Sequence, residues 1–143
     1  MRASEGQLRF VADFEPVALV ILAKAFVRVG ALDWWPLVIE DAGTTLGVVA
    51  LVDERRQHAQ LALFHLLVDR DHQRRGHGRA AVQALVALAR QDDQCDRLRL
   101  TVHPENHAAL ALYRSEGFTV DGVDADGELR LSTRTATEGG ALR

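Results

Sequence analysis

Between residues 69 and 79 the sequence gathers positive charge and glycine into one short segment. It contains four arginines and two glycines. Glycine lets a backbone approach a ligand closely, and arginine is a strong donor to phosphate oxygens. The segment precedes a predicted helix, whose first N–H groups have no partner inside the helix and whose dipole favours anions. The combination predicts a binding site for a pyrophosphate.

The same segment can be compared with two well-known phosphate-binding loops. A P-loop needs Lys and then Ser or Thr after its last glycine, whereas Arg and Ala follow here at 79–80. Residues 76–81 fit a loose dinucleotide-binding pattern, in which the strand normally leads almost directly into the first glycine. Here seven mostly polar residues separate Val68 from Gly76. An ordinary strand-to-helix connection with solvated arginines is the structural alternative.

The sequence around the segment predicts the elements that would position it. Residues 61–68 are a nearly continuous apolar run, typical of a central strand covered on both faces. Residues 80–90 repeat apolar side chains at helical spacing, which predicts an amphipathic helix. Residues 97–102 alternate leucine with polar side chains and predict a half-exposed strand.

Further elements are predicted on the N-terminal side. Residues 17–29 favour a helix, and residues 37–40 and 46–52 favour a β-hairpin around an Asp-Ala-Gly turn. The polar residues 53–58 predict a turn before the apolar strand.

The C-terminal side repeats the helix-and-hairpin pattern. Asn106 is a good N-cap for a helix over residues 108–113, and Gly117 stands where a left-handed residue commonly ends a helix. Residues 118–120 and 128–133 then predict a closing hairpin.

Bulk composition narrows the class of protein. With 143 residues and 48% hydrophobic residues, the chain predicts a single domain, placed at 1–134, followed by a disordered tail at 135–143. A formal charge of −3 gives no whole-chain attraction to nucleic acid or anionic membranes. The apolar run 17–29 is too short and too charged to span a bilayer as a helix. The first residues are not typical of a signal peptide, so we expect none. We expect a cytoplasmic protein with no nucleic-acid or membrane partner. The lone Cys95 predicts a bystander thiol, and no spacing suggests a metal site.

Two linked motifs resemble the GNAT (GCN5-related N-acetyltransferase) superfamily. Its central motif, Gln/Arg-x-x-Gly-x-Gly/Ala between a strand and a helix, is matched by residues 73–78 at every fixed position. The next family element is matched by Asn106, by Leu-Tyr at 112–113 and by Gly-Phe at 117–118. The run 63–69 most resembles the branch with bacterial spermine and spermidine acetyltransferases.

The resemblance covers roughly residues 37–131 and implies a fold. That fold is α/β (α+β), with a mixed, mostly antiparallel central sheet, helices on both faces and a splayed central strand pair. Before the segment aligned from Phe10 onward there is little room for the strand and helices that usually open the fold, so we expect an N-terminally abbreviated form. Three explanations would account for the short N-terminal part: a short natural form, a start codon assigned too late, or a partner chain that completes the sheet. A homodimer is therefore possible.

The resemblance also implies acetyl-CoA as cosubstrate and no metal. In the family, loop amides hold the pyrophosphate of coenzyme A, and backbone groups of the preceding strand hold the pantetheine arm. A backbone N–H near Val68 would polarise the thioester carbonyl. The implied cofactor-binding residues are Leu66, Leu67, Val68, Gln73, Arg74, Arg75, Gly76, His77, Gly78, Arg79, Asn106 and Tyr113.

Catalysis would need a proton donor for the thiolate and a base for the amine. Tyr113 corresponds to the family's usual donor; a half-buried helix tyrosine packing on the core is the alternative. Strand positions where relatives carry Glu or His are Ala62 and Phe64 here, which take no proton. His65 and His103 are the candidate bases. The alternative for His65 is a hydrogen-bonded core histidine, and the alternative for His103 is a cap of the loop. A water chain that removes the proton is the leading alternative to either base. Alternation points His65 to the other sheet face unless a bulge intervenes.

Together these features predict an N-acetyltransferase that passes acetyl from acetyl-CoA to a primary amine of a small molecule by direct attack, with polyamines among the candidates. A non-catalytic acyl-CoA-binding sensor of the same fold is the alternative, and a dinucleotide-dependent enzyme is a weaker one. Trp34 and Trp35, with the acidic Asp33, Glu40 and Asp41, either line an amine pocket or pack.

Overall fold

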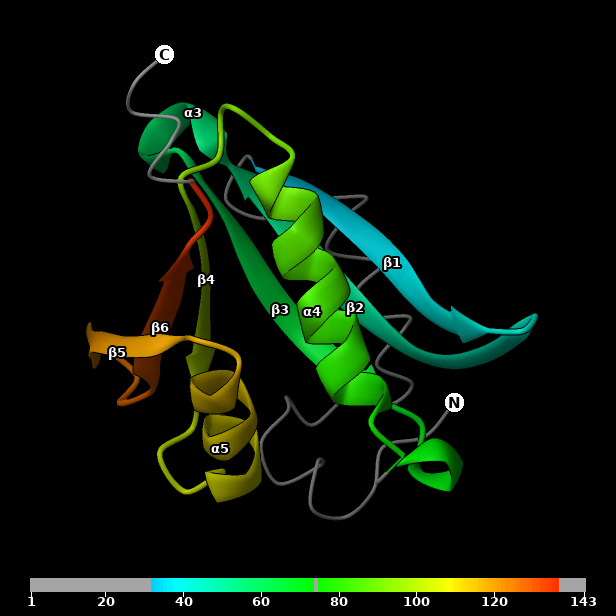
Figure 1. The fold of residues 1–143 in the computed structure, drawn as a ribbon. Coiled ribbons are helices and arrows are strands. Elements are labelled where there is room, and N and C mark those ends of the chain that lie inside the picture. The colour runs from blue at the N-terminus through cyan, green and yellow to red at the C-terminus, as the bar shows by residue number, and fades with distance from the viewer. Residues whose placement is uncertain (1–31, 74, 137–143) are drawn as a thin grey trace. The chain divides into compact units, whose positions relative to one another are not determined.

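The structure is a computed structural model that describes residues 32–73 and 75–136 (Figure 1). These residues hold six strands, joined in one sheet in the order β1-β2-β3-β4-β6-β5. The elements, in chain order, are β1 (Asp33–Asp41), β2 (Thr44–Glu54), α3 (Arg55–His58), β3 (Gln60–Val68), the 3-10 turn η2 (Arg70–His72), α4 (His77–Arg90), β4 (Arg97–Val102), α5 (His107–Ser115), β5 (Thr119–Val123) and β6 (Leu129–Arg134).

The predicted mixed, mostly antiparallel sheet is confirmed: β1 pairs with β2, and β6 pairs with both β4 and β5, all antiparallel. The chain divides into two compact units. Of the described residues, unit 1 contains 32–53, 63–73 and 75–81, and unit 2 contains 54–62 and 82–136. The predicted arrangement of helices on both faces of the sheet includes the helix at 17–29. That helix lies outside the described residues.

Unit 1 is built on the hairpin of β1 and β2. The two strands stay in register from Asp33 opposite Asp53 to Asp41 opposite Thr44, with one irregularity at residues 39–40. The two turn residues between them, Ala42 and Gly43, both have positive φ, as a two-residue hairpin turn of type I′ requires. The predicted hairpin is confirmed, and both strands are longer than predicted.

The core of unit 1 lies on β2 and the end of β3. Ala50 and Leu67 are buried against each other, and three half-buried side chains, Trp34, Val48 and Phe64, pack on them. Burying apolar surface stabilises this unit by roughly 25 cal/mol per Å². The core therefore fixes β3 where the arginine-rich loop begins.

Unit 2 follows the sequence pattern closely. On β4, Leu98, Leu100 and Val102 are buried while the alternate residues are not, so one face of the strand packs inward. The Oδ1 atom of Asn106 accepts a hydrogen bond of 3.3 Å from the N–H of Ala109, which confirms it as the N-cap of α5.

Element boundaries differ from the predictions in several other places as well. Residues 53–58 are not a simple turn, because β2 extends to Glu54 and α3 follows. Helix α4 begins at His77, immediately after the positive-φ Gly76, rather than at residue 80. Thr135, which the sequence places in the tail, is buried and donates a 3.0 Å hydrogen bond to the Cys95 carbonyl. The rest of the expected tail, from 137, lies outside the described residues.

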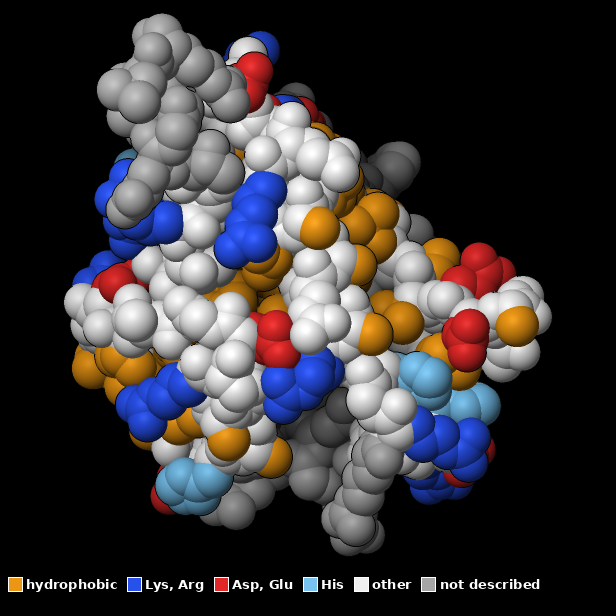
Figure 2. Space-filling model, in the orientation of Figure 1, with side chains coloured by type: hydrophobic (Ala, Val, Ile, Leu, Met, Phe, Trp, Pro, Cys, Tyr) orange, Lys and Arg blue, Asp and Glu red, His pale blue; other side chains and the backbone are white. Residues whose placement is uncertain are grey.

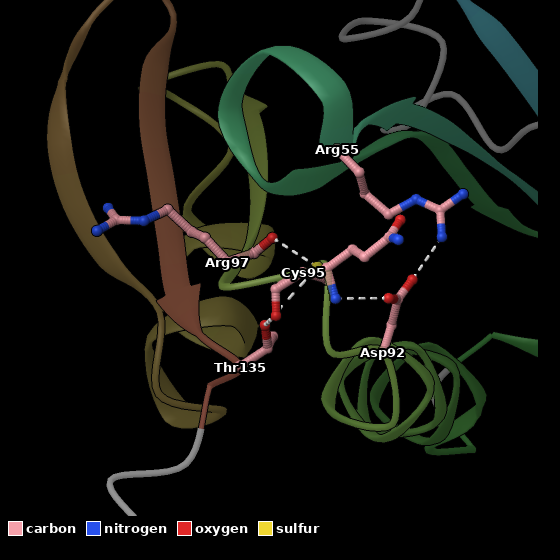
Figure 3. A network of polar contacts seen from close by, with 6 residues as sticks. Arg55, Asp92, Cys95, Arg97 and Thr135 are labelled. Atoms are coloured by element: carbon pink, nitrogen blue, oxygen red, sulfur yellow. Dashed lines mark hydrogen bonds and ion pairs between the residues drawn. The ribbon is translucent and has the colours of Figure 1, made fainter. Parts of the chain in front are cut away.

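A polar network surrounds the chain between α4 and β4 (Figure 3). Arg55 reaches from α3 to Asp92, with 2.6 Å between Nη1 and Oδ2. Cys95 is buried, and its Sγ donates to the Arg97 carbonyl at 3.2 Å. The thiol therefore has a packing role in unit 2, consistent with the bystander predicted for it.

Candidate functional site

The arginine-rich loop is tied back to the strand from which it leaves. The side-chain Nε2 of Gln73 donates a 2.8 Å hydrogen bond to the carbonyl of Val68. Between them, the N–H of Asp69 bonds to the Leu46 carbonyl at 2.7 Å, and the N–H of His72 closes the turn η2 onto the Asp69 carbonyl at 2.8 Å. The first residue of the predicted motif, Gln73, therefore holds the end of the strand.

The loop enters α4 through a glycine that leaves room for a ligand. Gly76 has φ of +80°, and a Cβ built there would meet no atom of the described part of the chain within 4 Å. The first bond of the helix runs from the Ala80 N–H to the Gly76 carbonyl at 3.0 Å, so the N–H groups of His77 and Gly78 precede the helical ladder. Such a helix start attracts anions.

Basic side chains gather around this helix start. Arg70, Arg75 and Arg79 are exposed, and His72 and His77 are half-buried. Figure 2 shows blue and pale blue side chains together where η2 and the beginning of α4 lie. The donor set of exposed guanidinium groups, open glycine and helix N-terminus fits a pyrophosphate. Arg74, the fourth predicted arginine, lies outside the described residues.

The backbone of strand β3 is irregular at His65. This residue has φ of 55°, the left-handed region that a non-glycine residue seldom adopts. Neighbouring residues on a regular strand point to opposite faces, yet the rings of Phe64 and His65 both lie beside Trp34, with centroid distances of 5.2 and 6.4 Å. The alternation that would have sent His65 to the other face is therefore broken.

The remaining implied contacts on β3 are Leu66, which is half-buried, and Leu67 and Val68, which are buried. Gly47, not singled out from the sequence, lies against this end of the strand: a Cβ added to it would be 2.2 Å from the Leu67 carbonyl oxygen. An isolated glycine inside a strand pattern is the signal that could have found it, because such a glycine often marks a close backbone approach.

Three further predicted residues belong to unit 2. Tyr113 on α5 is 7% exposed and packs edge-to-face on Phe118, with ring centroids 5.6 Å apart. Burial raises the pKa of Tyr113 to about 12, because the phenolate would be poorly solvated there. The Nδ1 atom of His103 accepts a 3.1 Å hydrogen bond from the Glu105 N–H, and the carbonyl of His103 accepts the N–H of Asn106 at 2.9 Å. His103 is therefore a loop cap.

Within the described residues, no group of three or more His, Cys, Asp or Glu side chains is placed to hold a metal ion. Over the same part of the chain, no helix has the length and apolarity needed to cross a membrane.

Comparison with known proteins identifies relatives of this arrangement. The model of the acetyltransferase (GNAT) family matches residues 10–118. N-acetyltransferase family 8 member 3 of Rattus norvegicus is 36% identical over 88 residues, which are 59% of this chain and 38% of that protein. N-acetyltransferase 8 of Homo sapiens is 34% identical over 77 residues, 54% of this chain and 34% of that protein. The chain thus spans less than half the length of these curated relatives.

Solved structures share the fold. Spermidine N-acetyltransferase from Vibrio cholerae, in complex with CoA and spermine, has a TM-score of 0.71 at 18% identity and covers 97% of this chain and 87% of its own. PaiA N-acetyltransferase from Thermoplasma acidophilum, in complex with coenzyme A, has a TM-score of 0.64 at 19% identity. The match covers 79% of this chain and 69% of that protein's chain. Because the family model spans most of the chain and the sheet has the same fold, this chain belongs to the GNAT family of acetyltransferases.

Proposed function

We propose that this chain is an acetyl-CoA-dependent N-acetyltransferase that passes the acetyl group to a primary amine of a small molecule. The observation that carries the proposal is the loop after β3, where Gly76 with φ of +80° leads into the start of α4 among exposed arginines. Membership of the GNAT family and the N-acetyltransferase names of its relatives support it. When bound, acetyl-CoA supplies the activated acetyl group.

The loop would grip the diphosphate of the cosubstrate. The N–H groups of residues 75–78 and the guanidinium groups of Arg74, Arg75 and Arg79 are the donors, because phosphate oxygens favour charged and backbone donors at a helix start. Backbone groups of residues 66–68 would hold the arm that carries the thioester. A donor N–H near Val68 would stabilise negative charge on the thioester carbonyl oxygen.

Tyr113 would return a proton to the leaving thiolate. With a pKa of about 12, its hydroxyl keeps its proton at neutral pH, so it can donate but cannot act as the base. The edge-to-face contact with Phe118 holds the ring, which supports a fixed direction for the hydroxyl. Asn106, at the start of the same helix, would also contact the cosubstrate.

For the base, we favour His65 over His103. An amine like that of lysine, with a pKa of about 10.4, is almost wholly protonated at neutral pH and must lose a proton before it attacks. Nδ1 of His103 accepts a backbone N–H, so taking up a proton there would break that bond. His65 has an uncommon left-handed backbone, and such strain clusters at functional sites. A water chain would serve if neither acts.

For the molecule that accepts the acetyl group, we propose a chemical class. Three half-buried rings, those of Trp34, Phe64 and His65, would provide an apolar and aromatic wall, which suits an alkylamine. The Vibrio cholerae neighbour was solved with spermine, and a polyamine is therefore our first candidate. We further propose a cytoplasmic protein, a monomer or homodimer, without nucleic-acid or membrane partners.

The proposal is tested by following free thiol while the protein is incubated with acetyl-CoA and a panel of amines. We expect turnover with at least one amine and a loss of about a hundredfold or more in kcat for Tyr113→Phe. Arg75→Glu should raise the KM for acetyl-CoA, whereas Arg56→Glu, the same charge change on exposed α3, should leave it unchanged. Binding of acetyl-CoA without turnover across the panel would favour the sensor instead, and no binding at all would refute both.

A further inference from the structure

The end of β3 lies directly against the backbone of β2 at Gly47. A Cβ built on Gly47 would be 2.2 Å from the carbonyl oxygen of Leu67 and 3.0 Å from the Cα of Val68. Both are backbone atoms, so no side-chain rotation can make room. Any side chain at position 47 would therefore push the Leu67 peptide group away by about 1 Å to restore van der Waals contact.

The same strand end is fixed from two other directions. On one side of it, the N–H of Asp69 donates to the carbonyl of Leu46, the residue before Gly47, at 2.7 Å. Toward the loop, Nε2 of Gln73 donates to the carbonyl of Val68 at 2.8 Å. Three independent contacts thus determine where the Leu67 and Val68 peptide groups lie. An ordinary surface connection is mobile and is not held by three such contacts.

We propose that Gly47 is a positioning residue for acyl-CoA binding: its missing side chain sets the Leu67–Val68 backbone where that backbone can pair with the pantetheine arm. The inference rests on the proposed function, because residues 66–68 hold the arm there. A hydrogen bond of about 2.9 Å is largely lost when donor and acceptor separate by a further 1 Å. A small displacement of this strand end would therefore weaken the grip on the arm directly. It would affect the diphosphate less, because the proposed diphosphate donors are the N–H groups of residues 75–78 at the start of α4.

The test is a comparison of two ligands by calorimetry on the full chain. Coenzyme A carries both diphosphate and arm, whereas 3′-phospho-ADP carries the diphosphate without the arm. For Gly47→Ala we expect the Kd of coenzyme A to rise about tenfold, the effect of losing one or two hydrogen bonds, and the Kd of 3′-phospho-ADP to change less than about twofold.

Gly122→Ala is the matched control. It also adds a methyl group to a strand glycine, but the nearest atom, 2.8 Å away, is Nη2 of Arg130 at the far end of a flexible side chain. This variant should bind both ligands like the parent protein. If the folded Gly47→Ala variant binds coenzyme A like the parent, or loses both ligands equally, the inference is overturned.

A second variant covers the case in which Gly47→Ala does not fold. Gln73→Ala releases the Val68 carbonyl without adding atoms to the interior. Gln73 also belongs to the predicted diphosphate motif, so some loss of 3′-phospho-ADP binding is expected, but the loss of coenzyme A binding should be the larger. Equal loss of both ligands would count against the inference. A parent protein that binds neither ligand would instead refute the proposed function, so the two failures are distinguishable.

Discussion

The guanidinium group of Arg99 holds the carboxylate of Glu54 through two hydrogen bonds, 2.7 Å from Nε to Oε1 and 2.8 Å from Nη2 to Oε2. Gln60 adds a third, of 3.1 Å, to Oε1. Burial raises the pKa of Glu54, but the hydrogen bonds and charge of Arg99, with smaller contributions from Gln60 and His58, outweigh it and leave the pKa below its ordinary value. Glu54 is therefore charged and paired in the folded protein.

This pair predicts an acid-sensitive contribution to stability. Because the pKa of Glu54 is lowered by folding, its stabilisation is present above the unfolded-state pKa of about 4.5 and is lost as the pH falls through the folded-state value. Glu54→Gln should lower the free energy of unfolding at pH 7 by about 2 kcal/mol and flatten its dependence on pH below about 5. Urea denaturation at a series of pH values measures both.

Glu40→Gln is the control for that experiment, because Glu40 is an exposed carboxylate on β1. Its substitution should change stability by less than about 0.5 kcal/mol. Equal acid sensitivity in the Glu54→Gln variant and the parent would show that the pair does not act as described.

Tyr113 predicts a loss of stability at alkaline pH. Its folded-state pKa of about 12 lies above the ordinary value of 10.0, so the unfolded chain ionises first as the pH rises. The contribution of Tyr113 to the free energy of unfolding is fully present below pH 10. It is lost at up to about 1.4 kcal/mol per pH unit between about pH 10 and 12. Tyr113→Phe removes this slope, which denaturation between pH 9 and 11 would reveal. An unchanged slope in the variant would mean that the hydroxyl is solvated.

Asn106 predicts a stability effect that depends on one oxygen atom. Asn106→Ala removes the acceptor for the Ala109 N–H and should lower the free energy of unfolding by about 1 kcal/mol. Asn106→Asp keeps an acceptor and should retain most of that energy, which chemical denaturation can measure. If the two variants lose equal stability, the cap is not the source of the effect.

His65 and His103 predict different kinetic outcomes. His65→Asn should lower kcat near neutral pH, with recovery at higher pH because the free amine becomes abundant there without a base. Asparagine tolerates left-handed φ, so the backbone at position 65 is preserved. His103→Asn should have a smaller effect on kcat, because Nδ1 already accepts a backbone bond. The reverse order in a pH-rate series would assign the base to His103, and an unchanged kcat in both variants would favour a water chain.

Much of unit 2 could be predicted from the sequence because its determinants are local. The alternation of β4 lies within six residues, and the cap of α5 joins Asn106 to Ala109. Gly117 ends the helix region with φ of +93°, as its position suggested. Interactions over so few residues are decided by side-chain type and by the periods of helix and strand. The arginine and glycine content of the loop likewise needed no tertiary information.

Other features were decided only by tertiary structure. Arg99 meets Glu54 across 45 positions of sequence, and the Leu67 carbonyl meets Gly47 through strand packing. The left-handed φ of His65 overrode the period-two pattern of β3 and brought its ring to the side of Trp34. Residue types and spacing determined what chemistry the loop could offer. Which backbone atoms face each other depends on how distant strands pack. The isolated glycine at position 47 indicates a close backbone approach, but it does not indicate which carbonyl approaches.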